Sequence, residues 1–168
     1  MNIQTSRLTL KPIDQSDLDA LVQLLTDDKV KQFYMLPDFA KREDAMTMAE
    51  KIRVLSQDPA RYVAGIYHGA QLLGLFNETA RENGQIEVGY ALLPQFWGQG
   101  YATEALTAAI DFFLREGFQA VLAAAFSENE ASMRVMVKSG MKRLDRQDAL
   151  EYRGKIHRCI YFSTMKPQ

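Results

Sequence analysis

The stretch from residue 85 to residue 113 limits what this chain can fold into more than any other part of the sequence. Its first part, Gln85 to Pro94, reads as a buried strand, and Pro94 ends that strand because proline cannot donate a hydrogen bond to a sheet. Its last part is an amphipathic helix, whose apolar residues recur at helical spacing: Ala102, Ala105, Leu106, Ala109, Ile110 and Phe113. The sequence therefore predicts a strand, a short loop and a helix in succession.

The loop between this strand and this helix contains two glycines, Gly98 and Gly100, and no ionisable side chain between Pro94 and Tyr101. Its chemistry must therefore come from backbone N–H groups, which a helix leaves unpaired in its first turn. Together with the positive end of the helix dipole, such groups make a site for an anion, most often a phosphate. The alternative is an ordinary tight turn, which a pair of glycines also favours.

Two common phosphate-binding motifs do not fit this loop. The P-loop of nucleotide hydrolases requires a lysine directly after its second glycine, and Tyr101 follows Gly100 here. The dinucleotide fingerprint requires a third glycine, where this chain has Thr103. What remains is a Gln-x-x-Gly-x-Gly loop that follows a strand.

Composition places the chain among ordinary globular proteins and excludes several classes. Its 168 residues suit one domain, predicted to span residues 1–168, and 47% hydrophobic with 24% charged residues is typical of a soluble protein. A net charge of −1 gives no electrostatic case for nucleic acid. Cys159 has no partner for an intramolecular disulfide, which is compatible with a cytoplasmic location. No segment reads as a signal peptide or a membrane span, and the two histidines and one cysteine do not suggest a metal site.

The segment from Gln95 to Ala102, Gln-Phe-Trp-Gly-Gln-Gly-Tyr-Ala, resembles the pyrophosphate loop that binds acetyl-CoA in the GNAT superfamily of N-acetyltransferases. Four further segments resemble the Rim-type branch, which acetylates the N-termini of ribosomal proteins. They are Ser6 to Pro12, Gly89-Tyr90, Trp97 to Ala105 and Asn129-x-x-Ser132. The resemblance covers nearly the whole chain and implies acetyl-CoA as co-substrate. The coenzyme contacts that it implies are Leu92, Leu93, Gln95, Phe96, Trp97, Gly98, Gln99, Gly100, Tyr101, Ala102, Thr103 and Asn129.

The remaining pattern predicts a mixed α/β fold. Strands are expected within residues 5–12, 62–67, 72–76, 85–94 and 121–126, with a C-terminal hairpin that turns at Arg153-Gly154. A helix is expected after Asp14, capped by Asp14 with Asp17 as an acidic partner, and another over residues 42–57. The strand at 121–126 follows a helical crossover and should lie parallel to the strand at 85–94. With the resemblance, this gives a GNAT-like fold: a mostly antiparallel sheet of six or seven strands, splayed at two parallel strands, with about four helices.

Acetyl transfer to an amine needs a base for the ammonium, a donor for the thioester oxygen and an acid for the departing thiolate. Glu151 and Glu87 are the candidate bases. Glu151 occupies the place before the hairpin tip where the Rim-type branch has its general base, but a plain exposed charge is the commoner role of a hairpin glutamate. Glu87 lies on the central strand, where a polar residue at the sheet surface is the alternative. The segment His157-Arg158-Cys159 departs from the family, which often has an acidic residue there.

The other catalytic roles follow from the same resemblance. Ser132 is the candidate acid near the coenzyme sulfur, with Tyr90, Tyr101 and Tyr152 as alternatives that the sequence does not rank. A backbone N–H near Leu92 or Leu93 should receive the thioester oxygen. Asn129 suits a helix N-cap, and the resemblance adds a contact with the pantetheine arm. Glu104 needs no role beyond complementing the helix dipole.

The sequence thus predicts an N-acetyltransferase in which a primary amine attacks acetyl-CoA directly in a ternary complex. The acceptor could be a protein N-terminus, such as that of a ribosomal protein, or a small amine or an antibiotic. An alternative is a non-catalytic acyl-CoA-binding sensor or regulatory module, and a third is a nucleotide-binding structural protein, which would bind ATP. No nucleic-acid or membrane partner is expected, and either a monomer or a homodimer fits the sequence.

Overall fold

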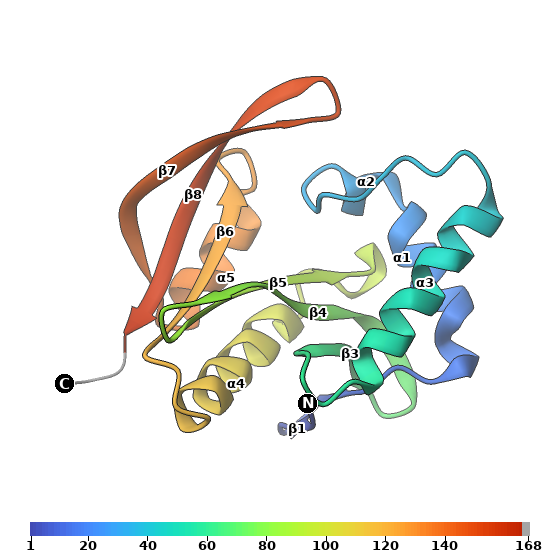
Figure 1. The fold of residues 1–168 in the computed structure, drawn as a ribbon, viewed down its shortest axis with the longest axis horizontal. Helices are drawn as coiled ribbons and strands as arrows, with labels where there is room; N and C mark the ends of the chain where they lie inside the picture. The colour runs from blue at the N-terminus through green and yellow to red at the C-terminus, as the bar shows by residue number, and fades with distance from the viewer. Residues whose placement is uncertain (166–168) are drawn as a thin grey trace.

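A computed structural model describes residues 1–165 and shows one open sheet flanked by helices (Figure 1). The strands lie in the order β1-β2-β3-β4-β5-β6-β8-β7, and β5 and β6 form the parallel pair. The strands are β1 (Ile3–Gln4), β2 (Thr9–Lys11), β3 (Val63–His68), β4 (Gln71–Glu82), β5 (Gln85–Leu92), β6 (Ala120–Phe126), β7 (Lys142–Tyr152) and β8 (Lys155–Met165). The α-helices are α1 (Leu18–Thr26), α2 (Asp28–Lys31), α3 (Arg42–Gln57), α4 (Tyr101–Arg115) and α5 (Glu130–Lys138). The predicted fold class is confirmed, with eight strands where six or seven were expected.

The helices cover both faces of the sheet and enclose two large apolar cores, and a third, smaller cluster lies around Phe126, Cys159 and Tyr161 (Figure 1). Alternate residues of β3 show the division, because Ala64 and Ile66 join the core under α4, whereas Val63 joins the core under α1 and α3. On α4, the predicted stripe is buried at Ala105, Leu106, Ala109, Ile110 and Phe113, whereas its first member, Ala102, is partly exposed and lines the cavity described below. The helical spacing in the sequence therefore identified the face of α4 that packs on the sheet.

The parallel pair separates part of the way along its length. Gln85 to Val88 of β5 pair with Ala120 to Ala123 of β6, and beyond Val88 the two strands no longer pair. Both strands nevertheless continue, β5 to Leu92 and β6 to Phe126. A slot therefore opens at the carboxyl end of the pair, as the sequence predicted, and it lies beside the loop that leads into α4.

The N-terminal segment differs from the prediction in two respects. Residues 5–12 contain the short strand β2, and a second short strand, β1, precedes it. The Asp14 side chain does not cap the following turn, because its carboxylate pairs with the Lys11 ammonium at 2.9 Å. Asp17 is likewise engaged elsewhere, since it accepts a hydrogen bond of 2.8 Å from the Tyr67 hydroxyl. The proposed capping pair is therefore wrong, and both carboxylates instead bind side chains of neighbouring strands.

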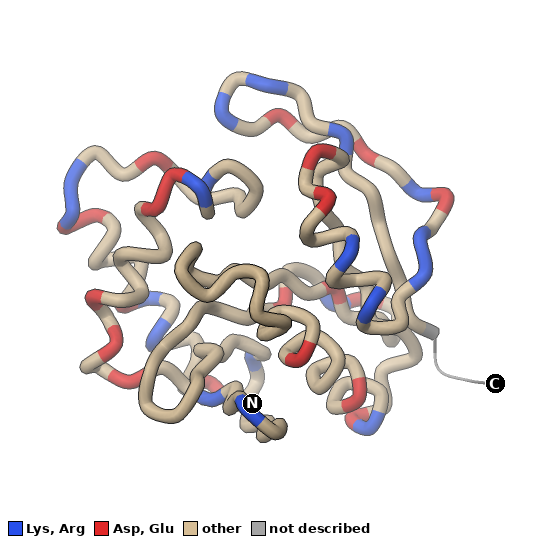
Figure 2. Tube along the Cα trace, turned by 180° about the vertical axis from the view of Figure 1, so that it is seen from behind, with Lys and Arg blue, Asp and Glu red and all other residues tan. Residues whose placement is uncertain are grey.

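Charged residues of both signs alternate along the outer helices and the β7–β8 hairpin, whereas the chain between Glu87 and Glu104 carries none (Figure 2). No ionisable acid or base with a charge at neutral pH lies between Glu87 and Glu104. The end of β5 beyond Glu87 and the loop that follows it therefore bring no charge to the slot, and Glu87 is the charged residue that β5 contributes.

Candidate active site

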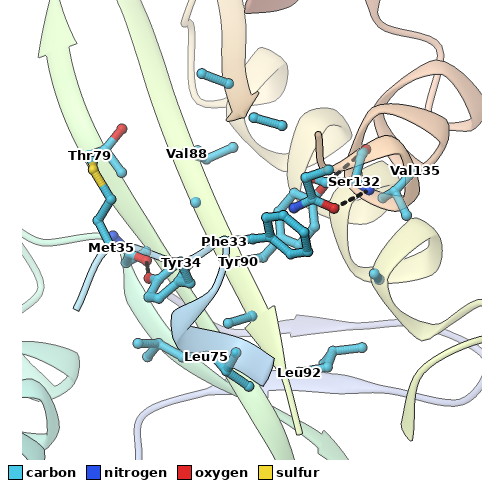
Figure 3. A pocket seen from close by; sticks show the side chains of 18 of the residues that line it. Phe33, Tyr34, Met35, Leu75, Thr79, Val88, Tyr90, Leu92, Ser132 and Val135 are labelled. Carbon is cyan, nitrogen blue, oxygen red and sulfur yellow. Dashed lines mark hydrogen bonds between the residues drawn. The ribbon is translucent and has the colours of Figure 1, made fainter. Parts of the chain in front are cut away.

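A cavity of about 840 Å³ lies where β5 and β6 separate (Figure 3). Its walls come from β4, β5, β6, α5, the α2 region and the first turn of α4, with further residues from α3, β3, β7 and β8. Of the residues predicted to contact the coenzyme, nine line this cavity: Leu92, Phe96, Trp97, Gly98, Gly100, Tyr101, Ala102, Thr103 and Asn129. Gln95, Gln99 and Leu93 are not among its lining residues.

The loop before α4 presents its backbone to this cavity. Gly98 and Gly100 have φ of 73° and 81°, values that glycine adopts readily and other residues adopt rarely. Gly100 is the N-cap of α4, and no described side chain caps the helix. The first hydrogen bond from this end is donated by the Glu104 N–H to the Gly100 carbonyl, at 3.0 Å. The N–H groups of the first turn are therefore available to an anion.

Two side chains brace the loop from within. The Trp97 indole Nε1 donates to the Leu92 carbonyl at 2.8 Å, and the Gln99 amide donates to the Gln95 carbonyl at 3.1 Å. The Gln99 side chain thus holds the loop by bonding to the backbone of Gln95. Leu93 has a different role from the one predicted, because its N–H already donates to the Leu73 carbonyl at 2.9 Å and is not free for a thioester oxygen.

Across the slot, Tyr90 of β5 reaches the first turn of α5 (Figure 3). Its hydroxyl lies 2.9 Å from Ser132 Oγ, and Asn129 Oδ1 accepts a hydrogen bond of 3.1 Å from the Ser132 N–H. Asn129 is therefore the N-cap of α5, which is the bland role expected for it, and it also faces the cavity. Burial raises the pKa of the Tyr90 hydroxyl to about 12, although its hydrogen bond with Ser132 opposes the rise. Tyr90 thus keeps its proton at neutral pH.

The three tyrosines that the sequence left unranked have separate positions. Tyr90 lies beside Ser132, whereas the Tyr101 ring packs under the Arg7 guanidinium at 4.7 Å. The Tyr152 hydroxyl donates to the Lys31 carbonyl at 2.6 Å and receives the Leu36 N–H at 3.3 Å. Tyr152 therefore ties the β7–β8 hairpin to the segment after α2, and Tyr90 alone of the three touches the candidate acid.

The two candidate bases, Glu87 and Glu151, have different positions relative to the cavity. Glu87 lines the cavity, and its Oε1 accepts a hydrogen bond of 3.0 Å from the Thr79 hydroxyl of β4. Glu151 is exposed on β7 and does not line the cavity. Its neighbours explain this position, because Leu150 lines the cavity and Tyr152 packs inward, and alternate residues of a strand face opposite sides. The structure therefore brings Glu87, and not Glu151, to the site.

Several cavity residues gave no catalytic signal in the sequence. Thr79 follows no motif and is identified by its contact with Glu87. Tyr34 likewise lines the cavity, and its hydroxyl donates a hydrogen bond to Asn77 Oδ1. Burial raises the pKa of Tyr34 above its ordinary value. The wall opposite the loop before α4 is therefore polar at a few points and apolar elsewhere.

The structure carries no sign of metal chemistry within residues 1–165, where no three His, Cys, Asp or Glu side chains gather in a metal-binding group. Within the same residues, no helix is long and apolar enough to cross a membrane. His68 is the exposed last residue of β3, and the buried Cys159 thiol has a pKa raised by burial.

Glu104, in the first turn of α4, does more than complement the helix dipole. Its carboxylate receives hydrogen bonds from the Thr5 hydroxyl at 2.6 Å, the Ser6 hydroxyl at 3.1 Å and Arg7 Nε at 2.6 Å. Burial alone would raise the pKa of Glu104, but these hydrogen bonds outweigh it and lower the pKa to about 2. The ionised carboxylate therefore fastens the N-terminal segment to α4.

We expect Glu104→Gln to make the pH dependence of stability weaker. The folded-state pKa lies below the unfolded value, so the ionised carboxylate stabilises the fold fully above about pH 5 and progressively less as the pH falls towards 2. The loss at pH 7 should be roughly 2–3 kcal/mol, and the wild-type and variant curves should converge in acid. Urea unfolding of both proteins between pH 7 and pH 3 measures this difference. A gap that stays constant across that range would contradict it.

Comparison with known proteins agrees with this geometry. The family model described as "Acetyltransferase (GNAT) domain" matches residues 7–142. The chain is 28% identical over 146 residues to the uncharacterized N-acetyltransferase YoaA of Bacillus subtilis, covering 84% of this chain and 82% of that protein. The curated relatives matched are themselves called N-acetyltransferases.

Two solved structures share the fold at low sequence identity. One is an acetyltransferase from Salmonella typhimurium that modifies the N-terminal serine of a 50S ribosomal subunit protein, with TM-score 0.83, 21% identity, and coverage of 99% of this chain and 100% of that one. The other is a microcin self-immunity acetyltransferase in complex with acetyl-CoA and AMP, with TM-score 0.83, 18% identity, and coverage of 96% and 94%. With the family model covering most of its length, this chain belongs to the GNAT family of acetyltransferases.

Proposed function

We propose that residues 1–168 form one N-acetyltransferase domain that moves the acetyl group of acetyl-CoA to a primary amine in a ternary complex. The observation that carries the proposal is the convergence of three features on one cavity: the uncapped N-terminus of α4, the slot between β5 and β6, and the Tyr90–Ser132 pair. A phosphate site, a channel for a thin chain and a proton donor are what a coenzyme thioester requires.

The residues present fit the coenzyme. The N–H groups at Gly98 to Thr103 suit a pyrophosphate, and the Cβ that Gly98 lacks would have open space around it, so the loop has room for a ligand. Beyond Val88, the strand edges no longer pair with each other and offer backbone groups to a pantetheine arm. Asn129 and Ser132 lie at the far side of the same slot. When bound, the coenzyme supplies an activated acetyl group as a thioester.

The chain's own residues then divide the proton transfers. Glu87 accepts the proton of the attacking ammonium, directly or through water, while the Thr79 hydroxyl orients its carboxylate. Ser132 donates its hydroxyl proton to the departing thiolate and regains a proton from Tyr90 through their hydrogen bond, and the Tyr90 hydroxyl, which is protonated at neutral pH, is then reprotonated from solvent. Glu151 remains the alternative candidate base. The variants Glu87→Gln and Glu151→Gln are therefore compared.

The acceptor is a primary amine, for which the Glu87 carboxylate is a suitable partner. A protein N-terminus is the acceptor of the Salmonella neighbour, and small amines remain equally compatible with this cavity. A second function, non-catalytic sensing of acyl-CoA, would use the same coenzyme site without the Glu87 and Ser132 proton transfers. Turnover with an amine discriminates the two.

Thermal unfolding with acetyl-CoA, free coenzyme A and ATP in parallel tests the donor site. A ligand at about 100 times its Kd adds ~2.7 kcal/mol, and each kcal/mol moves the Tm of a domain of this size by roughly 2–4 °C. We expect acetyl-CoA to raise the Tm by several degrees and ATP to leave it unchanged. Absence of any shift with either coenzyme A species would mean that the loop at residues 95–100 is an ordinary turn, and the proposed function would fall with it.

A further inference from the structure

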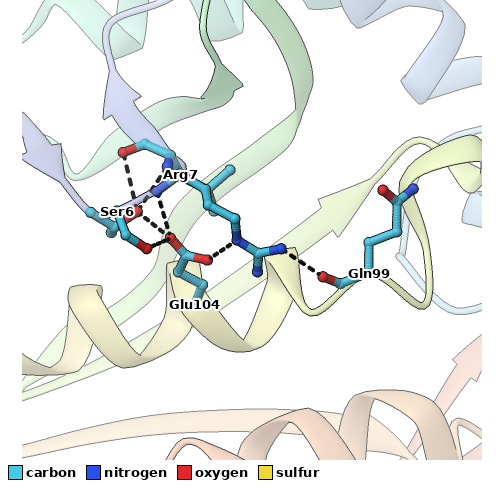
Figure 4. A network of polar contacts seen from close by, with 6 residues as sticks. Ser6, Arg7, Gln99 and Glu104 are labelled. Atoms are coloured by element: carbon cyan, nitrogen blue, oxygen red, sulfur yellow. Dashed lines mark hydrogen bonds and ion pairs between the residues drawn. The ribbon is translucent and has the colours of Figure 1, made fainter.

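Arg7 contacts the phosphate-site loop at the Gln99 carbonyl (Figure 4) and is not among the residues that line the cavity. One guanidinium nitrogen, Nη1, donates to the Gln99 carbonyl at 3.0 Å. The second terminal nitrogen, Nη2, lies close to Gly100, since a Cβ added to Gly100 would be 3.4 Å from it. Arg7 itself does not line the cavity, whereas Gly98 and Gly100 do. The guanidinium therefore supports the backbone of the loop without itself lining the cavity.

This contact has a consequence for the direction of one peptide group. The Gln99–Gly100 peptide is trans, since the described chain has no cis bond, so its carbonyl and its N–H point in opposite directions. With the Gln99 carbonyl held by Arg7, the Gly100 N–H is turned away from Arg7, and Gly100 itself lines the cavity. A glycine at φ 81° has wide backbone freedom, so the loop alone would not fix this direction.

The Arg7 side chain is itself held in place by α4. Arg7 Nε donates to Glu104 Oε2 at 2.6 Å, and the Arg7 backbone N–H donates to Glu104 Oε1 at 3.0 Å. The guanidinium also lies over the Tyr101 ring, 4.7 Å from its centroid. A planar guanidinium can bind Glu104 through Nε and Gln99 through Nη1 at once, which the single ammonium of a lysine cannot reproduce.

We propose that Arg7, held by Glu104, is a positioning residue for the coenzyme pyrophosphate: it fixes the Gln99–Gly100 peptide so that the loop's N–H groups face the ligand. This inference rests on the proposed function, because it requires that a pyrophosphate binds this loop. It assigns to the N-terminal segment, which lies 92 residues from Gln99 in the sequence, a part in the donor site. A purely structural role would affect the reaction with every acetyl donor alike. A positioning role affects only the reaction with donors that carry the pyrophosphate.

The test compares two acetyl donors in Arg7→Met and the wild-type enzyme. Acetyl-CoA carries the pyrophosphate, whereas the acetyl thioester of N-acetylcysteamine carries the same reacting group without it. We expect Arg7→Met to raise the KM for acetyl-CoA about tenfold or more, the loss expected when hydrogen bonds to charged groups are removed, while kcat/KM for the short thioester stays within about twofold. Arg115→Met, which removes an exposed arginine from the far end of α4, is the matched control and should change neither donor.

Arg7→Lys separates positioning from charge. We expect Arg7→Lys to be impaired with acetyl-CoA nearly as much as Arg7→Met, since it keeps the charge and loses the two-point contact. Restoration of the wild-type KM by lysine would overturn positioning in favour of simple electrostatic attraction. Equal losses with both donors would overturn it in favour of a general folding role. An unchanged KM for acetyl-CoA in Arg7→Met would overturn this inference alone, whereas a wild-type protein that binds no coenzyme would overturn the proposed function as well.

Discussion

Glu87→Gln should lower kcat by about 10²–10⁴-fold at saturating acetyl-CoA and amine, the range that a general base contributes. Glutamine keeps the size of the side chain and can still meet the Thr79 hydroxyl, so the fold and the cavity shape should survive. It cannot accept the proton of an ammonium ion. Steady-state rates of thiol release measure kcat, and a titration with coenzyme A should show that the Kd for the coenzyme is unchanged.

Glu151→Gln is the matched comparison, because both glutamates were candidates in the sequence and Glu87 alone lines the cavity. We expect Glu151→Gln to keep kcat within about threefold, as is usual for an exposed charge away from the reacting groups. The reverse result, a large loss in Glu151→Gln and a small one in Glu87→Gln, would mean that the hairpin tip moves over the acceptor during catalysis. Glu151 would then be the base.

Gly74→Ala should destabilise the protein by about 3 kcal/mol or more, because the added methyl has nowhere to go. A Cβ on Gly74 would lie 2.0 Å from the Ala91 carbonyl oxygen and 2.8 Å from the Leu92 Cα. Both are backbone atoms of β5, which cannot rotate aside as a side chain could. The Tm should fall by roughly 6–12 °C at 2–4 °C per kcal/mol.

Gly69→Asn provides the control for this substitution. Gly69 lies in the β3–β4 turn at φ 59°, where asparagine is better tolerated than other residues, and a Cβ there would meet nothing within 4 Å. We expect its Tm to stay within a few degrees of the wild type. If Gly74→Ala unfolds at the same temperature as Gly69→Asn, then β4 and β5 do not approach each other as closely as the structure shows.

The sequence was most informative where local rules and packing agree. The helical stripe of α4, the end of β5 near Pro94 and the glycine loop could be read directly, because apolar spacing, proline and glycine each restrict the backbone by themselves. Asn129 also followed a local rule, since its side chain caps the helix that begins after it. The local structure of the β5–α4 loop and of the start of α5, both of which border the cavity, was therefore largely predictable.

The other half depends on contacts between distant residues, which local patterns do not encode. Tyr152 binds backbone atoms more than 110 positions earlier, and Glu104 binds a segment nearly 100 positions earlier. Asp14 and Asp17 satisfied a capping pattern but were drawn to Lys11 and Tyr67 by the folded sheet. The choice between Glu87 and Glu151 is of the same kind, because it depends on which face of β7 turns to the cavity.

The most direct test of the central claim is acetyl transfer itself. Purified protein is mixed with acetyl-CoA and, in separate reactions, with a peptide that has a free N-terminus, a small primary amine and an amine-bearing antibiotic. Thiol release is followed together with the mass of each amine. The account predicts that thiol is released in step with the addition of one acetyl group to at least one of these amines. Tight binding of acetyl-CoA with no acetylated amine in any reaction would contradict it and favour a coenzyme sensor.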